Sequence, residues 1–321
     1  MVSGDDVLFC TESFYEGSRD RLAAVAPGLE AVLLRDGRDV SDDECARITL
    51  GTFTADAWPE RAAAFMKVAL QSPNLRWFHT MSAGTDAPVF KMFLDQGVTL
   101  TNSPGSSAAP IAATVITYLE MLARDMPRLS RAQADRRWDW FRWNELIGGR
   151  VGVVGWGPIG REVARLAEAH GMSPVVIRRA ARGDEGYPVR RLHDLAAAVH
   201  DCDAVVLALP LNEATRGLVT ADVFRAMPRG AFFVNIGRGE VVDEGALGEA
   251  LRSGHLGGAG LDVFATEPLP AGDPVWDLPN VIVTPHNSGS TDGTGTRADE
   301  IFFENLRRWV EGAELAHVVG K

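Results

Sequence analysis

Three charged residues in the second half of the chain could together perform acid–base chemistry on a small carboxylic acid. They are Arg238, Glu267 and His286. An arginine can hold a carboxylate with two parallel hydrogen bonds. A histidine can exchange a proton with a carbonyl or hydroxyl oxygen near neutral pH. A glutamate beside that histidine would orient the imidazole and favour its protonated form.

Each of the three residues also has an ordinary interpretation. Arg238 could be a surface charge, Glu267 a turn residue before Pro268, and His286 the cap of a strand that stops at Pro285. The joint pattern favours a site, because His286 is the one histidine that directly follows a strand and a proline in this series. The other six histidines, 79, 170, 193, 200, 255 and 317, lack that context.

The elements expected before these residues are strands. Apolar runs at Phe232–Asn235, Ala259–Leu261 and Val281–Val283 each lead into a loop that carries one of the three charges. In an open parallel sheet the loops after neighbouring strands meet at the carboxyl edge, where ligands bind. The spacing therefore predicts that the arginine, glutamate and histidine converge.

A glycine-rich loop precedes this series. The strand predicted at Val151–Val154 runs into Gly155-Trp156-Gly157-Pro158-Ile159-Gly160, and a helical pattern follows. In that context the first glycine permits a tight turn, the second lets backbone amides approach a pyrophosphate, and the third permits close helix–strand packing. The helix N-terminus adds N–H donors. The motif predicts a dinucleotide site with Gly155, Trp156, Gly157, Pro158, Ile159 and Gly160 as its cofactor-binding residues.

The next predicted strand ends in arginines rather than in an acid. Val175–Arg178 is followed by Arg179, with Arg182 three residues later and no carboxylate before Asp184. Guanidinium groups bind a 2′-phosphate, whereas a carboxylate at this place binds the ribose hydroxyl of NAD. Arg178 and Arg179 therefore favour NADP, with NAD possible; the alternative is a solvated basic loop.

Two domains are expected from the length of 321 residues and from two series of alternating strands and helices. We predict an α/β protein with two doubly wound parallel-sheet domains. One is a Rossmann-type dinucleotide-binding domain at 103–287, and the other is a flavodoxin-like substrate domain at 1–102 and 288–321. The boundary signal is the turn-forming run from Asn102 to Ser107, before a long apolar helix at 108–123.

Composition excludes several classes of protein. The net charge of −11 disfavours nucleic acid and anionic membranes as partners. Cys10, Cys45 and Cys202 are far apart and show no metal-ligand spacing, so no metal is predicted. No signal peptide or apolar run of about 18 residues is seen, so a cytoplasmic location is expected.

These motifs resemble the D-isomer-specific 2-hydroxyacid dehydrogenase family, of the glyoxylate/hydroxypyruvate reductase type. The resemblance spans nearly the whole chain and is strongest from Asn102 to Ser288, through the glycine loop, the run Leu-Pro-Leu-Asn-Glu-Ala-Thr-Arg-Gly at 209–217 and the three strand-to-loop stretches. It implies an active site in a cleft between the two domains. It also implies that Arg238 binds the substrate carboxylate and carbonyl, and that His286 is the catalytic acid in reduction, with Glu267 as its partner.

The resemblance assigns further residues. The loop Ser82, Ala83 and Gly84 would bind the substrate carboxylate through backbone amides. Asp262 would contact the nicotinamide carboxamide. Leu209, Pro210, Thr215 and Ile236 would complete the cofactor site. Three positions depart from the family pattern: Ala113 replaces an acid, Asn287 replaces a small apolar residue, and the substrate loop reads Met-Ser-Ala-Gly-Thr-Asp.

The function predicted is hydride transfer between NADPH and a small 2-oxo acid such as glyoxylate, hydroxypyruvate or pyruvate, giving the D-2-hydroxy acid. Two alternatives stay open: a reductase of bulkier 2-oxo acids such as phenylpyruvate, and a non-catalytic dinucleotide-sensing protein like the family's corepressors. A homodimer is expected, because the segment 111–143 is long, apolar and aromatic. Trp138, Trp140 and Trp143 would belong to the dimer arm, to a pocket rim, or to an ordinary packing cluster.

Overall fold

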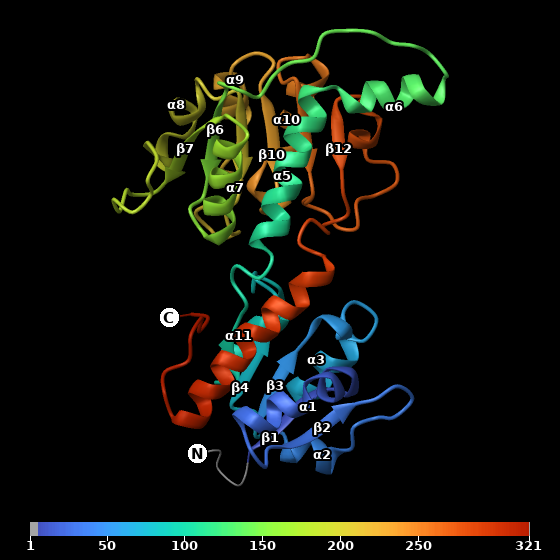
Figure 1. Cartoon of the computed structure of the whole chain (residues 1–321), viewed down its shortest axis with the longest axis vertical. Helices are drawn as coiled ribbons and strands as arrows, with labels where there is room; N and C mark the ends of the chain where they lie inside the picture. The colour runs from blue at the N-terminus through green and yellow to red at the C-terminus, as the bar shows by residue number, and fades with distance from the viewer. Residues whose placement is uncertain (1–5, 321) are drawn as a thin grey trace. The chain divides into compact units, whose positions relative to one another are not determined.

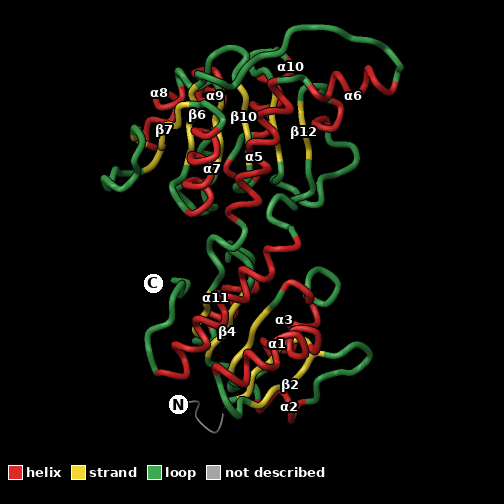
Figure 2. Tube along the Cα trace, in the orientation of Figure 1, coloured by secondary structure: helices red, strands yellow, loops and turns green. Residues whose placement is uncertain are grey.

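Two parallel β-sheets organise the chain in the computed structural model, which describes residues 6–320 (Figure 1). The fold divides into two compact units, Met1–Ser107 with Thr291–Lys321, and Ala108–Ser290. Each unit has its own sheet with helices on both faces, as the strands in yellow and helices in red show in Figure 2. The prediction of two doubly wound α/β domains is confirmed.

The sheet of the first unit has the strand order β2-β1-β3-β4-β5, which is the flavodoxin-like order. All of its strand pairs are parallel. Its strands are β1 (Val7–Thr11), β2 (Glu30–Leu34), β3 (Leu50–Phe53), β4 (Trp77–Thr80) and β5 (Thr99–Thr101). Its helices are α1 (Glu12–Val25), α2 (Asp42–Arg47), α3 (Ala62–Gln71), α4 (Pro88–Asp95) and α11 (Asp292–Glu311).

Alternate strand residues of this sheet fill two cores. Phe9 and Phe78 face α3 and α4, where they pack with Phe65 and Phe93. The next residues in β1 and β4 point to the opposite face, which α1 and α11 cover. The ring of Trp77 there stacks on Phe302 with centroids 5.7 Å apart. Because successive strand residues alternate between faces, the near-continuous apolar strands are explained by burial on both sides.

The second unit contains a sheet of order β12-β11-β10-β9-β6-β7-β8, in which every pair is parallel. Its strands are β6 (Arg150–Val154), β7 (Ser173–Arg178), β8 (Val189–Arg191), β9 (Ala204–Leu207), β10 (Phe232–Asn235), β11 (Gly258–Leu261) and β12 (Val281–Val283). Its helices are α5 (Ala108–Ala123), α6 (Met126–Ala134), α7 (Pro158–Ala169), α8 (Leu195–Val199), α9 (Ala221–Ala226) and α10 (Glu244–Arg252). The strand order reverses at β6, as in a Rossmann sheet.

Helices cover both faces of this second sheet. α5 and α7 lie side by side on one face (Figure 1), over a core that includes Val151, Val153 and Val234. α8, α9 and α10 cover the other face, over Val205, Phe233 and their neighbours. Gly260 lets α5 come close to β11, since a Cβ there would lie 2.5 Å from the Tyr118 ring.

Several elements begin where local signals place them. Helix α1 begins at Glu12, because Thr11 accepts a hydrogen bond from Phe14 N and caps it there. Helix α3 begins at Ala62, so Pro59 lies in the preceding turn. The last helix, α11, begins at Asp292. The short strand β8 was not predicted.

The junctions between the units also differ from the predicted bounds of 102/103 and 287/288. Ser103 belongs with the first unit, because its hydroxyl is hydrogen-bonded to the His79 ring at 3.0 Å and to Thr80 O at 3.1 Å. Ser288 belongs with the second unit, because its hydroxyl donates to Asp262. The junctions therefore follow Ser107 and Ser290.

Two further features are absent within residues 6–320. No helix there combines the length and apolar character that a membrane crossing requires. No cluster of three or more His, Cys, Asp or Glu side chains with metal-binding geometry occurs among the same residues. The three cysteines are buried and unbridged.

Candidate active site

The three residues expected to converge follow neighbouring strands of the second sheet. Arg238 follows β10, Glu267 lies in the loop after β11, and His286 follows β12. These strands are adjacent and parallel, so their carboxyl ends lie at one edge. The order in the sheet therefore places three loops with complementary charges beside one another.

The histidine and the glutamate form a direct hydrogen-bonded pair. His286 Nδ1 lies 2.8 Å from Glu267 Oε2. The other carboxylate oxygen, Oε1, accepts a hydrogen bond of 2.9 Å from Phe264 N. The two side chains are 45% and 35% exposed. With Nδ1 bonded to the carboxylate, the Nε2 atom remains as the position from which a proton could pass to or from a bound molecule.

His286 adopts a left-handed backbone conformation with φ of 49°. Such a conformation is uncommon outside glycine and persists where surrounding contacts fix it. Here the fixing contact is the backbone of Asp262, whose carbonyl accepts from His286 N at 2.8 Å. The turn aims the imidazole at Glu267 rather than letting it continue the strand direction.

Asp262 anchors the histidine loop with its side chain as well. Asp262 is 1% exposed, and its carboxylate accepts hydrogen bonds from Asn287 N at 3.0 Å and Ser288 N at 3.2 Å. The hydroxyl of Thr284 donates to it at 2.5 Å, and the Ser288 hydroxyl donates to its other oxygen. The structure thus shows Asp262 holding the chain on both sides of His286. Its contact with a nicotinamide carboxamide stays a prediction.

A tyrosine from α5 completes this buried network. The Tyr118 hydroxyl is hydrogen-bonded to Thr284 Oγ1, and burial raises the pKa of Tyr118 to about 12. The phenol therefore stays protonated at physiological pH. Tyr118 and Thr284 connect the helix on the sheet face to the carboxylate that fixes the histidine loop.

Arg238 lies between two glycines that make close backbone contacts. A Cβ at Gly237 would lie 2.8 Å from Leu209 O, and one at Gly239 would lie 1.9 Å from Phe264 C. Asn235 fixes the same turn, since its side chain accepts from Gly237 N and donates to Arg238 O. The arginine is therefore held between the loops after β9 and β11. Its Nη1 donates to Gly237 O at 2.7 Å.

Glu244, at the start of α10, supports the loop that carries Glu267. Its carboxylate accepts a hydrogen bond of 2.8 Å from Ala265 N. Burial raises the pKa of Glu244, with nearby Asp273 among the other acids that contribute. Glu244 and Glu267 therefore hold the backbone at Ala265 and Phe264 respectively, which explains the defined shape of this loop.

The glycine loop has the geometry expected for binding a dinucleotide. Gly155 has φ of 110°, and a Cβ there would lie 2.4 Å from Ala208 O. A Cβ at Gly160 would lie 2.1 Å from Gly155 O. At Gly157, which precedes the first residue of α7, a Cβ would meet nothing within 4 Å. The first and third glycines are thus required by packing, while the second leaves open space at a helix N-terminus that no side chain caps.

The basic loop after β7 contains an ion pair that the sequence did not indicate. Arg178 Nη1 lies 2.7 Å from Glu185 Oε1, and the Glu185 side chain is 3% exposed. Arg179 is exposed. The loop therefore contains both the predicted arginines and a buried carboxylate seven residues after the strand end.

The remaining predicted cofactor residues lie near the ends of β9 and β10. Leu209 and Pro210 follow β9, and Thr215 is buried in the same loop, with its hydroxyl donating to Pro210 O at 2.8 Å. Ile236 follows β10 and is 6% exposed. Trp156 packs edge-on to Tyr187, with Arg161 over its ring. Their contacts with a cofactor stay predictions.

The predicted substrate loop lies in the first unit. Ser82, Ala83 and Gly84 follow β4 at the carboxyl edge of that sheet. Asn102 fixes the loop by donating to Ala83 O at 2.6 Å, and Ser103 N donates to Ser82 O at 3.1 Å. Its contribution to the site in the second unit stays a prediction.

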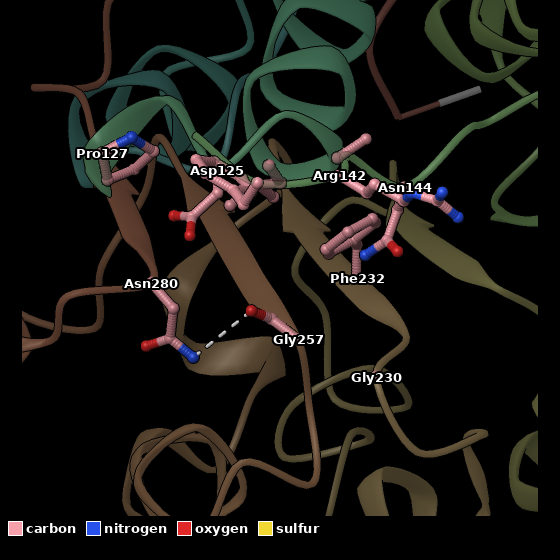
Figure 3. Close-up of a pocket in the computed structure, with 11 residues that line it drawn as sticks. Asp125, Pro127, Arg142, Asn144, Gly230, Phe232, Gly257 and Asn280 are labelled. Atoms are coloured by element: carbon pink, nitrogen blue, oxygen red, sulfur yellow. Dashed lines mark hydrogen bonds between the residues drawn. The ribbon is translucent and has the colours of Figure 1, made fainter. Parts of the chain in front are cut away.

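A pocket of about 280 Å³ lies at the opposite edge of the second sheet (Figure 3). Phe232 lines it at the start of β10, as do Gly257 and Asn280, which immediately precede β11 and β12. Asn280 Nδ2 is 3.5 Å from Gly257 O across this pocket. Because Arg238, Glu267 and His286 follow the other ends of these strands, the pocket is separate from the candidate active site.

Comparison with known proteins supports the chemistry of this site. Residues 116–288 match the family described as D-isomer specific 2-hydroxyacid dehydrogenase, NAD binding domain. The chain is 32% identical over 255 residues to a glyoxylate reductase of Korarchaeum cryptofilum, covering 75% of each protein. It is 34% identical over 232 residues to glyoxylate/hydroxypyruvate reductase B of Pectobacterium carotovorum subsp. carotovorum, covering 70% of this chain and 72% of that protein.

A solved structure of a similar protein has the same fold. The crystal structure of a D-isomer specific 2-hydroxyacid dehydrogenase from Xanthobacter autotrophicus Py2, in complex with NADPH and MES, is 31% identical. It aligns with a TM-score of 0.78 over 98% of this chain and 97% of that one. With the site geometry above, these matches show that the chain belongs to the D-isomer specific 2-hydroxyacid dehydrogenase family of oxidoreductases.

Proposed function

We propose that the protein reduces small 2-oxo acids, such as glyoxylate, hydroxypyruvate or pyruvate, to D-2-hydroxy acids, with NADPH as the favoured cofactor and NADH as a possible one. The observation that carries this proposal is the hydrogen bond between His286 and Glu267. It lies at the carboxyl edge of the second sheet, where Arg238 follows the neighbouring strand β10. This arrangement combines an acid, a group that orients the acid, and a cation for the substrate carboxylate.

Arg238, His286 and Glu267 each have a separate role in the proposed reaction. A bound reduced nicotinamide supplies the hydride to the 2-carbon. Arg238 binds the substrate carboxylate, so that the carbonyl oxygen faces His286. His286 gives a proton from Nε2 to that oxygen as negative charge develops on it. Glu267 holds Nδ1 and stabilises the imidazolium before the transfer.

The glycine loop and the basic loop support the choice of cofactor. Gly157 and the uncapped start of α7 fit a pyrophosphate, which accepts hydrogen bonds from backbone N–H groups. The arginines after β7 fit a phosphate on the adenosine ribose. The similar structure from Xanthobacter autotrophicus Py2 is described in complex with NADPH.

The names of the relatives favour small substrates over bulky ones. The proteins from Korarchaeum cryptofilum and Pectobacterium carotovorum subsp. carotovorum are named for glyoxylate or hydroxypyruvate reduction. We assign Ser82, Ala83 and Gly84 to the substrate carboxylate, as complements to Arg238.

A substrate panel tests the proposal. NADPH and NADH oxidation would be measured with glyoxylate, hydroxypyruvate, pyruvate and phenylpyruvate, for the wild type, Arg238→Ala and the control Arg225→Ala. Arg225 is an exposed residue of α9 that pairs with Asp222. We expect turnover of the three small acids, unchanged kinetics in the control, and both a raised KM and a lowered kcat in Arg238→Ala. A preference for phenylpyruvate, or cofactor binding without any turnover, would contradict it.

A further inference from the structure

A buried carboxylate already occupies the basic loop where an adenosine phosphate would bind. Glu185 Oε1 accepts from Arg178 Nη1 at 2.7 Å and from Arg182 N at 2.8 Å. Glu185 Oε2 accepts from Gly183 N at 2.9 Å. The side chain is only 3% exposed. Three donors thus surround one anion that belongs to the chain itself.

The contacts of Glu185 keep it ionised and fixed. The hydrogen bond from Arg182 N, with those from Gly183 N and Arg178, lowers the pKa of Glu185 below its usual range. A buried charge that lost these partners would be costly, so the carboxylate does not leave the loop freely. Its negative charge compensates the positive charge of Arg178, whose side chain is 15% exposed.

Two other arginines of the same loop are placed differently. Arg179 and Arg182 are exposed. Within residues 6–320, neither of their side chains makes a hydrogen bond or an ion pair, although Arg182 N binds Glu185. The exposed acid Asp184 pairs with Arg161 at 3.0 Å and lies 3.7 Å from Arg178. Among the arginines of this loop, those without a carboxylate partner are therefore Arg179 and Arg182.

We propose that Glu185 sets the strength of the preference for NADPH over NADH, by holding Arg178 as an internal ion pair and leaving the 2′-phosphate to Arg179 and Arg182. This inference rests on the proposed function for its cofactor class. Glu185 is a positioning residue: it touches Arg178 and the loop backbone, and it acts on the phosphate by keeping one cation occupied. The preference for NADPH over NADH is therefore weaker than it would be if Arg178, Arg179 and Arg182 could all bind the phosphate.

The alternative role for a carboxylate at this place is direct binding of the ribose hydroxyls of NAD. The observed contacts disfavour it, because both oxygens of Glu185 already accept hydrogen bonds from the loop. The two roles predict opposite results when the charge is removed. Loss of a ribose ligand would weaken NADH binding, whereas release of Arg178 would strengthen NADPH binding.

The test is direct titration of purified full-length variants with NADPH and NADH, following quenching of protein fluorescence. Glu185→Gln keeps the size of the side chain and one acceptor oxygen while removing the charge. Glu249→Gln is the matched control, since the same substitution removes the same charge from a side chain of α10 that is 76% exposed and pairs with Arg252. Thermal unfolding of each variant checks that the loop substitution leaves the fold intact.

We expect Glu185→Gln to lower the Kd for NADPH about tenfold, the low end for one added hydrogen bond between charged groups, and to leave the Kd for NADH unchanged. The control should change either Kd by less than about twofold, because its charge is screened by solvent. In the Arg178→Ala background the gain from Glu185→Gln should disappear. Arg179→Ala should weaken NADPH binding alone.

Either of two results in Glu185→Gln would overturn the inference: an unchanged or raised Kd for NADPH, or a raised Kd for NADH. A gain that persists without Arg178 would also contradict it, since Glu185 would then act on the phosphate without the ion pair. Because the titrations require no 2-oxo acid, an error in the proposed substrate would leave their outcome unaffected. Failure of the wild type to bind either cofactor would instead contradict the proposed function.

Discussion

His286 shows how one residue can combine an unusual backbone with a defined chemical role. The carbonyl of Asp262 accepts a hydrogen bond from His286 N and fixes its left-handed conformation. The carboxylate of Glu267 is hydrogen-bonded to Nδ1 and fixes the ring. The imidazole is therefore oriented before a substrate arrives, which reduces the reorganisation needed during reaction. Asp262 and Ser288 contribute through the backbone that carries the ring, rather than through the ring itself.

Replacement of His286 should remove the acid without removing the cofactor site. We predict that His286→Gln lowers kcat for 2-oxo acid reduction by about 10²- to 10⁴-fold, the usual contribution of general acid catalysis. The Kd for NADPH should stay nearly unchanged. Steady-state kinetics and cofactor titration measure both effects. His200→Gln, which changes an exposed histidine bonded to Ala197 O, serves as the control. Activity within a few fold of the wild type would leave the mechanism without its acid.

Glu267 should control the orientation of the acid. Its carboxylate lies 2.8 Å from His286 Nδ1, so Glu267→Gln should leave the imidazole less firmly held. We predict that this variant lowers kcat/KM for 2-oxo acid reduction about tenfold or more, the usual effect of losing one hydrogen bond to a charged group. The Kd for NADPH should stay nearly unchanged, and steady-state kinetics with cofactor titration measure both effects. A variant with the kcat/KM of the wild type would show that Glu267 does not position the acid.

At the scale of elements, two glycines of the loop before α7 are needed for different reasons. Gly160 is needed for packing, and Gly157 is needed for cofactor binding. Gly160→Ala should destabilise the protein, because its Cβ would lie 2.1 Å from Gly155 O. We expect a cost of about 1–3 kcal/mol in the free energy of unfolding. Gly157→Ala should leave stability nearly unchanged, because that Cβ enters open space. It should instead weaken NADPH binding about tenfold or more, by obstructing hydrogen bonds to the phosphates.

Thermal unfolding and cofactor titration of this pair of glycine variants distinguish the two requirements. Gly157→Ala carries the same added methyl group as Gly160→Ala and serves as its control for stability. If Gly157→Ala bound NADPH as tightly as the wild type, the loop would not approach the pyrophosphate at this residue.

Helix α11 contains an acid whose environment couples stability to pH. Burial, together with the charge of Asp56, raises the pKa of Asp299 to about 7. The folded protein therefore retains a proton that the unfolded chain releases near pH 4, and stability falls as pH rises from about 4 to 7. We predict that Asp299→Asn stabilises the protein at pH 8 by about 1–3 kcal/mol, and by much less at pH 4.

Differential scanning calorimetry at the two pH values measures the Asp299 effect. Glu311→Gln, which changes an exposed acid at the end of the same helix, should shift the unfolding temperature only slightly and similarly at both. Equal stabilisation by Asp299→Asn at pH 4 and pH 8 would show that this carboxyl is not protonated in the folded state near neutral pH.

At the scale of the whole molecule, only part of the segment 111–143, predicted as a dimer interface, is exposed. The apolar residues of α5, such as Ile111, Val115 and Leu119, are buried in the core of their own unit, so they are not free to bind a partner. Within the predicted interface, the large exposed apolar side chains are Trp138, Trp140 and Trp143, in segment 135–149, which runs as a coil after α6 (Figure 2). Trp138 is 94% exposed and Trp140 is 76% exposed.

We predict that this segment forms the interface of a homodimer. Large exposed aromatic side chains gathered in one segment mark an interaction surface, and a second copy is the commonest partner. Sedimentation velocity at micromolar concentration should give a dimer, and the double substitution Trp138→Ala with Trp140→Ala should shift it toward the monomer. Trp58→Ala, at a tryptophan that is 59% exposed in the first unit, should leave the dimer intact. A monomeric wild type would remove this claim.

The sequence by itself determined the fold class, the order of strand-to-loop motifs, and the positions of Arg238, Glu267 and His286 in those loops. These features depend on local signals: apolar runs of strand length, glycines at fixed spacing, and prolines that end strands. Parallel strands bring their carboxyl ends to one edge, so local signals were enough to predict that the three loops meet. The His286–Glu267 contact follows from that rule.

Tertiary structure alone decided the features that depend on side chains meeting across the chain. Nothing in the run Arg-Gly-Asp-Glu at 182–185 showed that Glu185 would be buried against Arg178. The anchoring of the histidine loop by Asp262, the assignment of Ser103 to the first unit and the raised pKa of Asp299 were equally hidden. Burial and partner choice are set by the register and packing of distant elements, which the spacing of residue types along one chain does not encode.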